Sequence, residues 1–242
     1  ATDATITLNN ANAFTGAVSL NTTGSSGNAT VVDASDLNLG ASTVGGNLIA
    51  TATTGNMTDS GALTIAGTSS FTTSANNATI ALNTTNNAFT GAVTITTNDN
   101  SGTDADVRID GGTTALILAA STIDGDLTVI SGNASGITDS GTVTVGGKLL
   151  AVTDANSGVI NLDSLAVDAG IHLRTHGTGD ATAVNDAGLG FGAGGSTVGG
   201  NLIATATTGN LWDYGSLTVG GTTTLTTSAT NADIILNNAN AF

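Results

Sequence analysis

The chain has 242 residues, of which 34 are Gly and none is Pro or Cys. Its formal net charge is −15, with 18 acidic residues against three Lys and Arg, and 39% of its residues are hydrophobic. The composition excludes collagen, which needs Pro and Gly at every third position, and it excludes a disulfide framework. It also argues against nucleic acid as a partner, because phosphate backbones repel an acidic chain. No apolar run is long enough for a spanning helix, so we expect no membrane insertion.

The elements predicted along the chain are short strands. Aliphatic residues alternate with Thr, Ser or Ala in short runs, and the breaks between runs are rich in Gly, Asn, Asp and Ser. Such alternation predicts strands with one buried face, separated by tight turns, and no stretch has the periodicity of a helix. In chain order, the predicted inward positions are Ile80, Leu82, Val93, Ile95, Leu127, Val129, Val143 and Val145.

Long internal repeats decide how these strands are arranged. The segment STVGGNLIATATTGN at 42–56 recurs unchanged at 196–210, and the related STIDGDLTVISGN lies between them at 121–133. A second family of repeats, ATITLNNANAFTGAV, begins at Ala4 and returns in altered form at Ala78 and Ala232. We therefore predict one solenoid over residues 1–242, built from units of about 76 residues. The predicted units are a partial one at 1–41, two complete ones at 42–120 and 121–195, and a partial one at 196–242.

Repetition favours a parallel β-helix over a sandwich or barrel, because each coil of a solenoid stacks on a near-copy of itself. Each unit divides into three pieces, which predicts about nine coils of roughly 25 residues, each with three strands. The lack of Pro fits this fold, since Pro would remove a hydrogen bond from the ladder. We expect Asn ladders at the corners that contain Asn76, Asn77, Asn86 and Asn87.

Several motifs resemble the shaft repeats of filamentous-haemagglutinin-like exoproteins, which are bacterial adhesins exported by two-partner secretion. They are LTVGGTTTLTT at 217–227, NAFTGAV at 12–18 and 87–93, and TDSG at 58–61 and 138–141. The resemblance implies a right-handed parallel β-helix on the bacterial cell surface or outside the cell. It also implies a structural role in adhesion, biofilm or fibre formation, with self-association or end-to-end continuation, and with glycans or cell surfaces as partners.

Trp212 and Tyr214 are the candidate surface-contact residues. They replace Thr58 and Ser60 of an earlier copy, while Asp213 matches Asp59. Residues two apart on a strand share a face, and exposed neighbouring rings can stack on sugars or pack against another protein. We predict that both rings point outward, because the preceding Leu211 occupies an apolar inward position.

Metal binding has weak support in the sequence. His172 and His176 are predicted to lie on one outer face with Arg174 between them, but residues four apart on a strand are too distant to share one ion. Asp104, Asp106 and Asp110 cluster without the spacing of a calcium loop. We therefore expect no cofactor and no defined metal site, although the acidic surface leaves room for loosely bound Ca²⁺.

Catalysis also has weak support. Polysaccharide lyases and related hydrolases use β-helices, so an enzyme or a glycan-binding domain on this fold is the alternative function. Lys148, Arg108 and Arg174 are predicted to lie in separate coils without a shared acidic partner, and no catalytic motif is present. We therefore expect no catalytic residues and no enzymatic activity.

Ice binding is a further alternative, because Thr-x-Thr pairs repeated on successive coils would form a regular face. The pairs at 51–53 and 205–207 are replaced by Val-Ile-Ser at 129–131 in the intervening copy. This replacement predicts an interrupted array.

Overall fold

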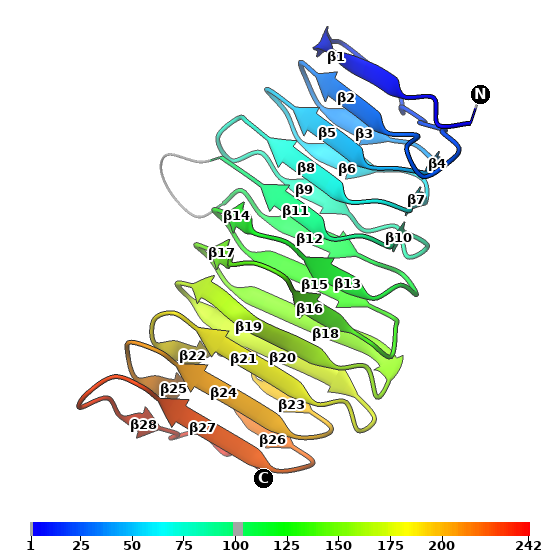
Figure 1. Ribbon diagram of the computed structural model, residues 1–242. Coiled ribbons are helices and arrows are strands. Elements are labelled where there is room, and N and C mark those ends of the chain that lie inside the picture. Colours follow the sequence, from blue (N-terminus) through cyan, green and yellow to red (C-terminus); the bar gives the residue numbers. More distant parts are fainter. Residues whose placement is uncertain (1, 99–103) are drawn as a thin grey trace.

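The computed structural model describes residues 2–98 and 104–242. In these residues the chain forms strands and turns, and no helix that could cross a membrane is present. The strands stack in parallel coils along one axis, with the N-terminus at one end and the C-terminus at the other (Figure 1). The predicted parallel β-helix is therefore confirmed.

The coils are smaller and more numerous than the sequence predicted. The solenoid has about 11 turns of roughly 21 residues, rather than nine of 25. In one turn, for example, Leu48 pairs with Ser69 on the next coil. The prediction failed because it assumed that each 76-residue unit contains a whole number of coils.

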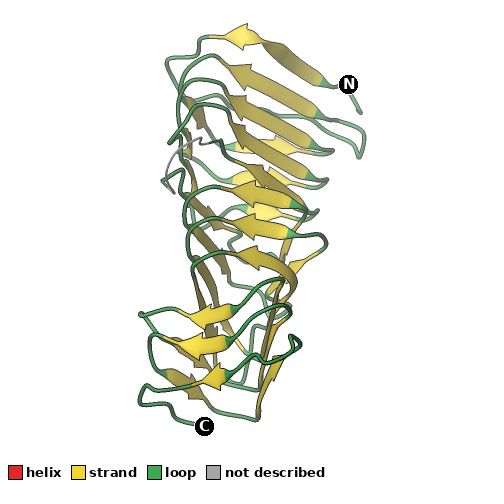
Figure 2. Ribbon diagram, turned by 90° about the vertical axis from the view of Figure 1, so that its left-hand side faces the viewer, coloured by secondary structure: helices red, strands yellow, loops and turns green. Residues whose placement is uncertain are grey.

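The strands form three sheets, which we call sheets A, B and C (Figure 2). Sheet A has 13 strands: β1 (Ile6–Asn12), β2 (Ala29–Asp33), β5 (Leu48–Ala52), β8 (Ser69–Thr73), β11 (Val93–Thr96), β13 (Leu116–Leu118), β14 (Ser121–Ile123), β16 (Ile137–Asp139), β17 (Val143–Val145), β19 (Ile160–Val167), β21 (Ala181–Asn185), β24 (Leu202–Ala206) and β27 (Thr223–Thr227). Sheet B has 12 strands: β3 (Leu37–Leu39), β6 (Met57–Asp59), β9 (Ile80–Leu82), β12 (Val107–Asp110), β15 (Leu127–Ser131), β18 (Leu149–Asn156), β20 (Gly170–His176), β22 (Leu189–Phe191), β23 (Ser196–Val198), β25 (Leu211–Asp213), β26 (Leu217–Val219) and β28 (Ile234–Ile235). Sheet C has three strands: β4 (Ser42–Val44), β7 (Leu63–Ile65) and β10 (Ala88–Phe89).

A single apolar core runs inside the coils. All eight predicted inward residues, from Ile80 to Val145, are fully buried. Residues in register form columns through this core, and Ala50, Phe71 and Ile95 are successive members of one column. Phe71 meets Phe89 from sheet C edge to face, with ring centroids 5.7 Å apart. Alternation along each strand thus fills the core with stacked aliphatic residues and a few rings.

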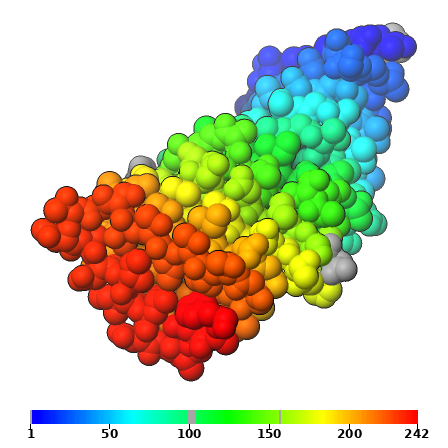
Figure 3. Space-filling model, turned by 60° about the horizontal axis from the view of Figure 1, so that its bottom comes forward, coloured from blue at the N-terminus to red at the C-terminus, as the bar shows by residue number. Residues whose placement is uncertain are grey.

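Equivalent residues of neighbouring repeat units lie on different sheets. The copies of one strand that begin at Leu48, Leu127 and Leu202 belong to sheets A, B and A. With roughly 21 residues per coil, a unit of about 76 residues spans about three and a half coils. Each unit is therefore rotated by about half a turn relative to the previous one. Successive coils nevertheless stay in order along the rod, as the colour bands of Figure 3 show.

This rotation changes the basis of the prediction of an interrupted array of Thr-x-Thr pairs. The Val-Ile-Ser segment at 129–131 lies in sheet B, whereas the Thr pairs at 51–53 and 205–207 begin in sheet A. On the outer face of sheet A, five successive coils carry Thr in register, namely Thr51, Thr72, Thr96, Thr122 and Thr144. The row holds one Thr on each of these coils and ends at Val32 and Ala166, so a continuous array of Thr-x-Thr pairs is not formed there.

Side chains of Asn and Asp connect the coils at the corner before several strands. The Asn28 Oδ1 accepts a hydrogen bond from the backbone N–H of Asn47, and the Asn47 Oδ1 accepts one from that of Thr68. Asp106 and Asp126 repeat the arrangement farther along the rod. These ladders run from side chain to backbone, and most lie at corners other than the predicted ones.

The predicted corner asparagines behave differently from one another. Asn87 is buried, and its side chain bonds to the backbone N–H of Leu63 and to the carboxylate of Asp59 on the previous coil. Asn76 accepts a hydrogen bond from Asn98. Asn77 has a left-handed φ of 61°, which suits a tight turn. Of the predicted corner residues, Asn76 thus makes one Asn–Asn contact between coils, whereas Asn87 bonds to Asp59 and to backbone.

Replacing Asn47 by Ala should test the ladder. Because the variant leaves the Thr68 N–H without its acceptor, we expect the free energy of unfolding to fall by about 1 kcal/mol. Urea unfolding followed by circular dichroism measures the change. Asn47→Asp keeps the acceptor oxygen and should lose less stability, so equal losses in the two variants would count against the ladder.

Candidate functional site

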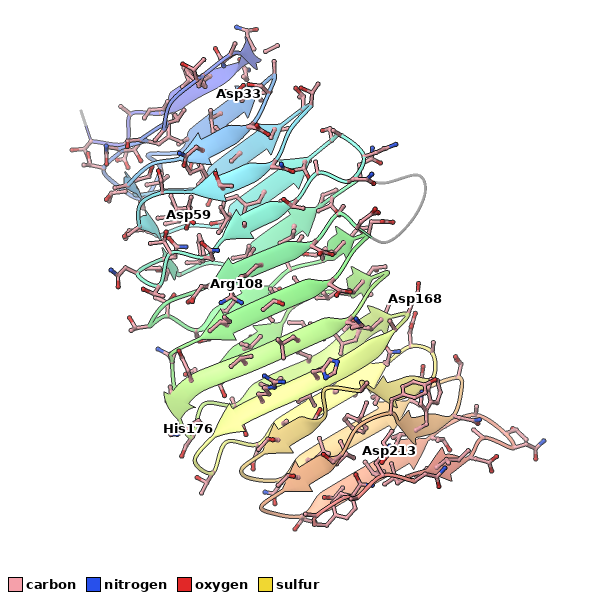
Figure 4. All side chains as sticks on the ribbon, turned by 180° about the vertical axis from the view of Figure 1, so that it is seen from behind. Asp33, Asp59, Arg108, Asp168, His176 and Asp213 are labelled. Carbon is pink, nitrogen blue, oxygen red and sulfur yellow. The ribbon has the colours of Figure 1, made fainter. Side chains whose placement is uncertain are left out.

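The outer face of sheet B gathers the basic residues of this acidic chain. Register in the sheet runs from Arg108 through Thr128 and Leu150 to His172, one strand at a time. Arg174 lies two residues beyond His172 on the same strand, β20. Figure 4 views the rod from behind and labels Arg108 and His176 at different heights along it. Strands β15, β18 and β20, which follow β12 in sheet B, thus bring residues of separate coils onto one surface.

A hollow of about 210 Å³ lies on this face. We call it the basic hollow, and its lining comprises Asp126, Leu127, Thr128, Lys148, Leu150, His172, Arg174 and Gly194. The Lys148 Nζ is 3.9 Å from an Asp126 carboxylate oxygen, and both side chains are largely exposed. Asp126 also lines the neighbouring hollow that contains Arg108. Stacking therefore gives Lys148 an acidic partner on the preceding coil and places that carboxylate between the hollows that contain Arg174 and Arg108.

The outer face of β22 and its flanking residues carries glycines instead of larger side chains. The rings of His172 and Trp212, from the neighbouring strands β20 and β25, cover this face. His172 lies against Gly192 and Gly194, and a Cβ on Gly192 would overlap its imidazole. The His172 Nδ1 is 3.2 Å from the carbonyl oxygen of Gly195, to which it donates a hydrogen bond. From the other side, the Trp212 indole lies over Gly188 and Gly190, where a Cβ would come within 2.6 Å of the ring.

Trp212 and Tyr214 form what we call the aromatic corner. Their ring centroids are 6.1 Å apart and the ring planes meet at 75°. Trp212 is half-buried against the glycines, while Tyr214 is 64% exposed. The structure places both rings on the outer face, as the alternation predicted. Their role in contacting a partner stays a prediction.

Asp213, between the two rings, has a structural role. Its carboxylate accepts hydrogen bonds from the backbone N–H groups of Asn237 and Asn238 and from the Asn240 side chain. Burial raises the pKa of this carboxyl, but these hydrogen bonds outweigh burial, so the net pKa is lowered below 3.8. The matching residues Asp59 and Asp139 accept equivalent bonds from the next coil.

This pKa shift predicts a pH-dependent contribution to stability. Because the folded pKa of Asp213 lies below the unfolded one, its contribution is present above about pH 4 and is lost as the pH falls below that value. We expect Asp213→Asn to lower the urea midpoint at pH 7, and the difference from the wild type to shrink at pH 3. Asp110 is the opposite case, since burial is the largest effect on its carboxyl and raises its pKa. Asp110→Asn should therefore cause no comparable loss at pH 7, and a loss equal to that of Asp213→Asn would contradict the assignment.

The other predicted residues do not converge on one point. His176 is exposed, and Ile171 and Leu173 are buried, as the strand alternation predicted. Asp106 and Asp110 accept backbone hydrogen bonds from Asp126 and Gly112 respectively. Among residues 2–98 and 104–242, no three His, Cys, Asp or Glu side chains lie together as a metal-binding group would require.

Comparison with known sequences identifies the repeat family. A family described as "Repeats of unknown function (DUF5649)" matches residues 26–96, 104–171 and 178–242. The chain belongs to this family of repeats. Neither a curated protein nor a solved structure has significant similarity to the chain.

The three DUF5649 repeats coincide with the alternation of sheets along the rod. In the first repeat the strands β2, β5 and β8 lie in sheet A, and in the second the equivalent strands β12, β15 and β18 lie in sheet B. In the third, β21, β24 and β27 return to sheet A. The basic hollow therefore spans the junction of two repeats, because Asp126, Lys148 and Leu150 lie in the second repeat, His172 and Arg174 follow it, and Gly194 lies in the third. The aromatic corner belongs to the third repeat. Their juxtaposition depends on how successive repeats meet.

Proposed function

We propose that this chain is a segment of the shaft of a secreted or cell-surface bacterial fibre, where it spaces adhesive elements. Support comes from the single core that passes through all coils, because each added coil lengthens the rod by about 4.8 Å without changing its cross-section. The similarity of several motifs to filamentous-haemagglutinin-like shafts points the same way. A rod with a continuous packed core resists bending, which suits a spacer.

The unchanged repeat supports this role most directly. Segments 42–56 and 196–210 are identical, and their strands β5 and β24 lie in the same sheet, seven strand positions apart. Ile49 and Ile203, the matching outward residues, have nearly equal exposures of 47% and 46%. Repeating this segment thus lengthens the rod and keeps the same outward residues on sheet A.

Inserting a second copy of residues 42–195 after residue 195 tests the proposal, because the new junction reproduces the native sequence around Ser196. We expect electron microscopy to show the rod lengthening from about 50 Å to about 85 Å, since seven coils are added. On a cell surface, the longer rod should extend the reach of an attached adhesive domain without changing its affinity. A particle that does not lengthen, or release of sugars from polysaccharide by the purified protein, would refute a purely spacing role.

A further inference from the structure

We propose that the outer face of sheet B binds an acidic polysaccharide, with its carboxylates in the basic hollow and a sugar ring against the aromatic corner. This inference goes beyond the shaft role, because a rod can act as a spacer whether or not one of its faces binds a glycan. It assigns a ligand class to residues that the sequence placed in separate coils.

Charge complementarity supports the first half of the site. The chain carries a net charge of −15, yet Lys148 and Arg174, two of its three Lys and Arg residues, line one hollow with His172. Asp126 offsets part of the Lys148 charge. Arg174 is exposed and can present its fork of N–H donors to a carboxylate in a bidentate arrangement.

The geometry of the rings supports the second half. The half-buried Trp212 indole lies over the backbone of β22, and Tyr214 stands at 75° to it. A flat ring bounded by an upright one forms a corner in which the apolar face of a sugar can stack. Because Gly190 lies in β22 and Gly192 directly follows it, the backbone here adds no side chain between this corner and His172.

The two halves are close enough for one polymer. Strands β18, β20, β22 and β25 are consecutive in sheet B, so the basic hollow and the aromatic corner are about 15 Å apart along the rod axis. A chain molecule that lies along the rod can contact both, whereas a small anion would reach only the hollow. We therefore assign the site to a polymer of uronic acids.

The net negative charge of the rod does not prevent such binding at physiological salt. Charges farther than about 8 Å away are largely screened there, whereas contacts within the hollow are screened less. The local cations therefore decide the interaction, and the distant Asp residues contribute little.

The chain contains its own reporter for this proposal, because Trp212 is its only Trp. Titration with galacturonic acid oligomers at about 0.15 M salt, close to physiological, should change Trp212 fluorescence in a saturable manner. Carboxyl-reduced oligomers of the same length keep the sugar rings but lack the carboxylate charges, and they should bind at least roughly tenfold more weakly.

Matched variants locate the site. Arg174→Ala should weaken binding by roughly tenfold, since it removes a charge-assisted contact. Arg108→Ala removes the same charge outside the hollow and should change the affinity by less than about twofold. Tyr214→Ser keeps the reporter and should also weaken binding. Circular dichroism spectra that match the wild type show that each variant is folded.

Four results would overturn the proposal. The first is equal affinity for the native and the carboxyl-reduced oligomers. The second is equal weakening by the Arg174 and Arg108 substitutions. The third is the absence of both a fluorescence change and a heat of binding with millimolar oligomer. A fluorescence change that depends only on protein concentration would likewise overturn it, because the occupant would then be a second copy of the chain. None of these results affects the length measurement that tests the shaft role.

Discussion

Replacing Phe71 by Ala is expected to lower the free energy of unfolding by about 3–5 kcal/mol, because it leaves a cavity in a core that has few large side chains. Phe71 is fully buried in β8 and stacks in register between Ala50 and Ile95. The substitution also removes the edge-to-face contact between Phe71 and Phe89. The small Ala50 makes room for the ring on the coil below, so no neighbour is placed to fill the space that the substitution creates.

Urea unfolding followed by circular dichroism measures this loss. Thr72→Ala is the matched control, because Thr72 follows Phe71 on the same strand but points outward. We expect the control to change the stability by less than about 0.5 kcal/mol. A similar change in both variants would show that the core of this coil is loosely packed, contrary to the structure.

Replacing Gly136 by Ala is the second substitution with a large expected effect. Gly136 joins β15 to β16 with a φ of +67°, a left-handed conformation that is unfavourable for Ala. A Cβ at this position would also overlap the carbonyl oxygen of Val159 on the next coil. Because backbone must move to admit the methyl group, we expect a loss of at least about 2 kcal/mol.

Gly16→Ala provides the comparison, since nothing lies within 4 Å of a Cβ at that exposed position. The melting temperature of the Gly16 variant should match the wild type, while that of the Gly136 variant should fall by several degrees. A Gly136 variant as stable as the wild type would mean that neighbouring coils separate more easily than their close stacking implies.

The sequence predicted part of the candidate site. Alternation along the strands correctly placed Trp212 and Tyr214 outward and Leu211 inward. It could not show that Lys148, Arg174 and Asp126 line one hollow, because this depends on which residues of successive coils are in register. Nor could it show that the Trp212 ring lies on Gly190, since that contact joins strands of adjacent coils.

The repeats and the two-residue alternation by themselves determined that this chain is a parallel solenoid and which residues fill its core. Both signals can be read from the sequence alone, because side-chain direction in a strand alternates with every residue and repeated units build a stacked solenoid. Only the tertiary structure decided the coil length, the half-turn between units and the surfaces that result. These depend on how tightly each corner turns, and a change of a few residues per coil moves a side chain such as that of Leu127 from one sheet to another. The threonine row on sheet A and the basic hollow on sheet B both follow from that rotation.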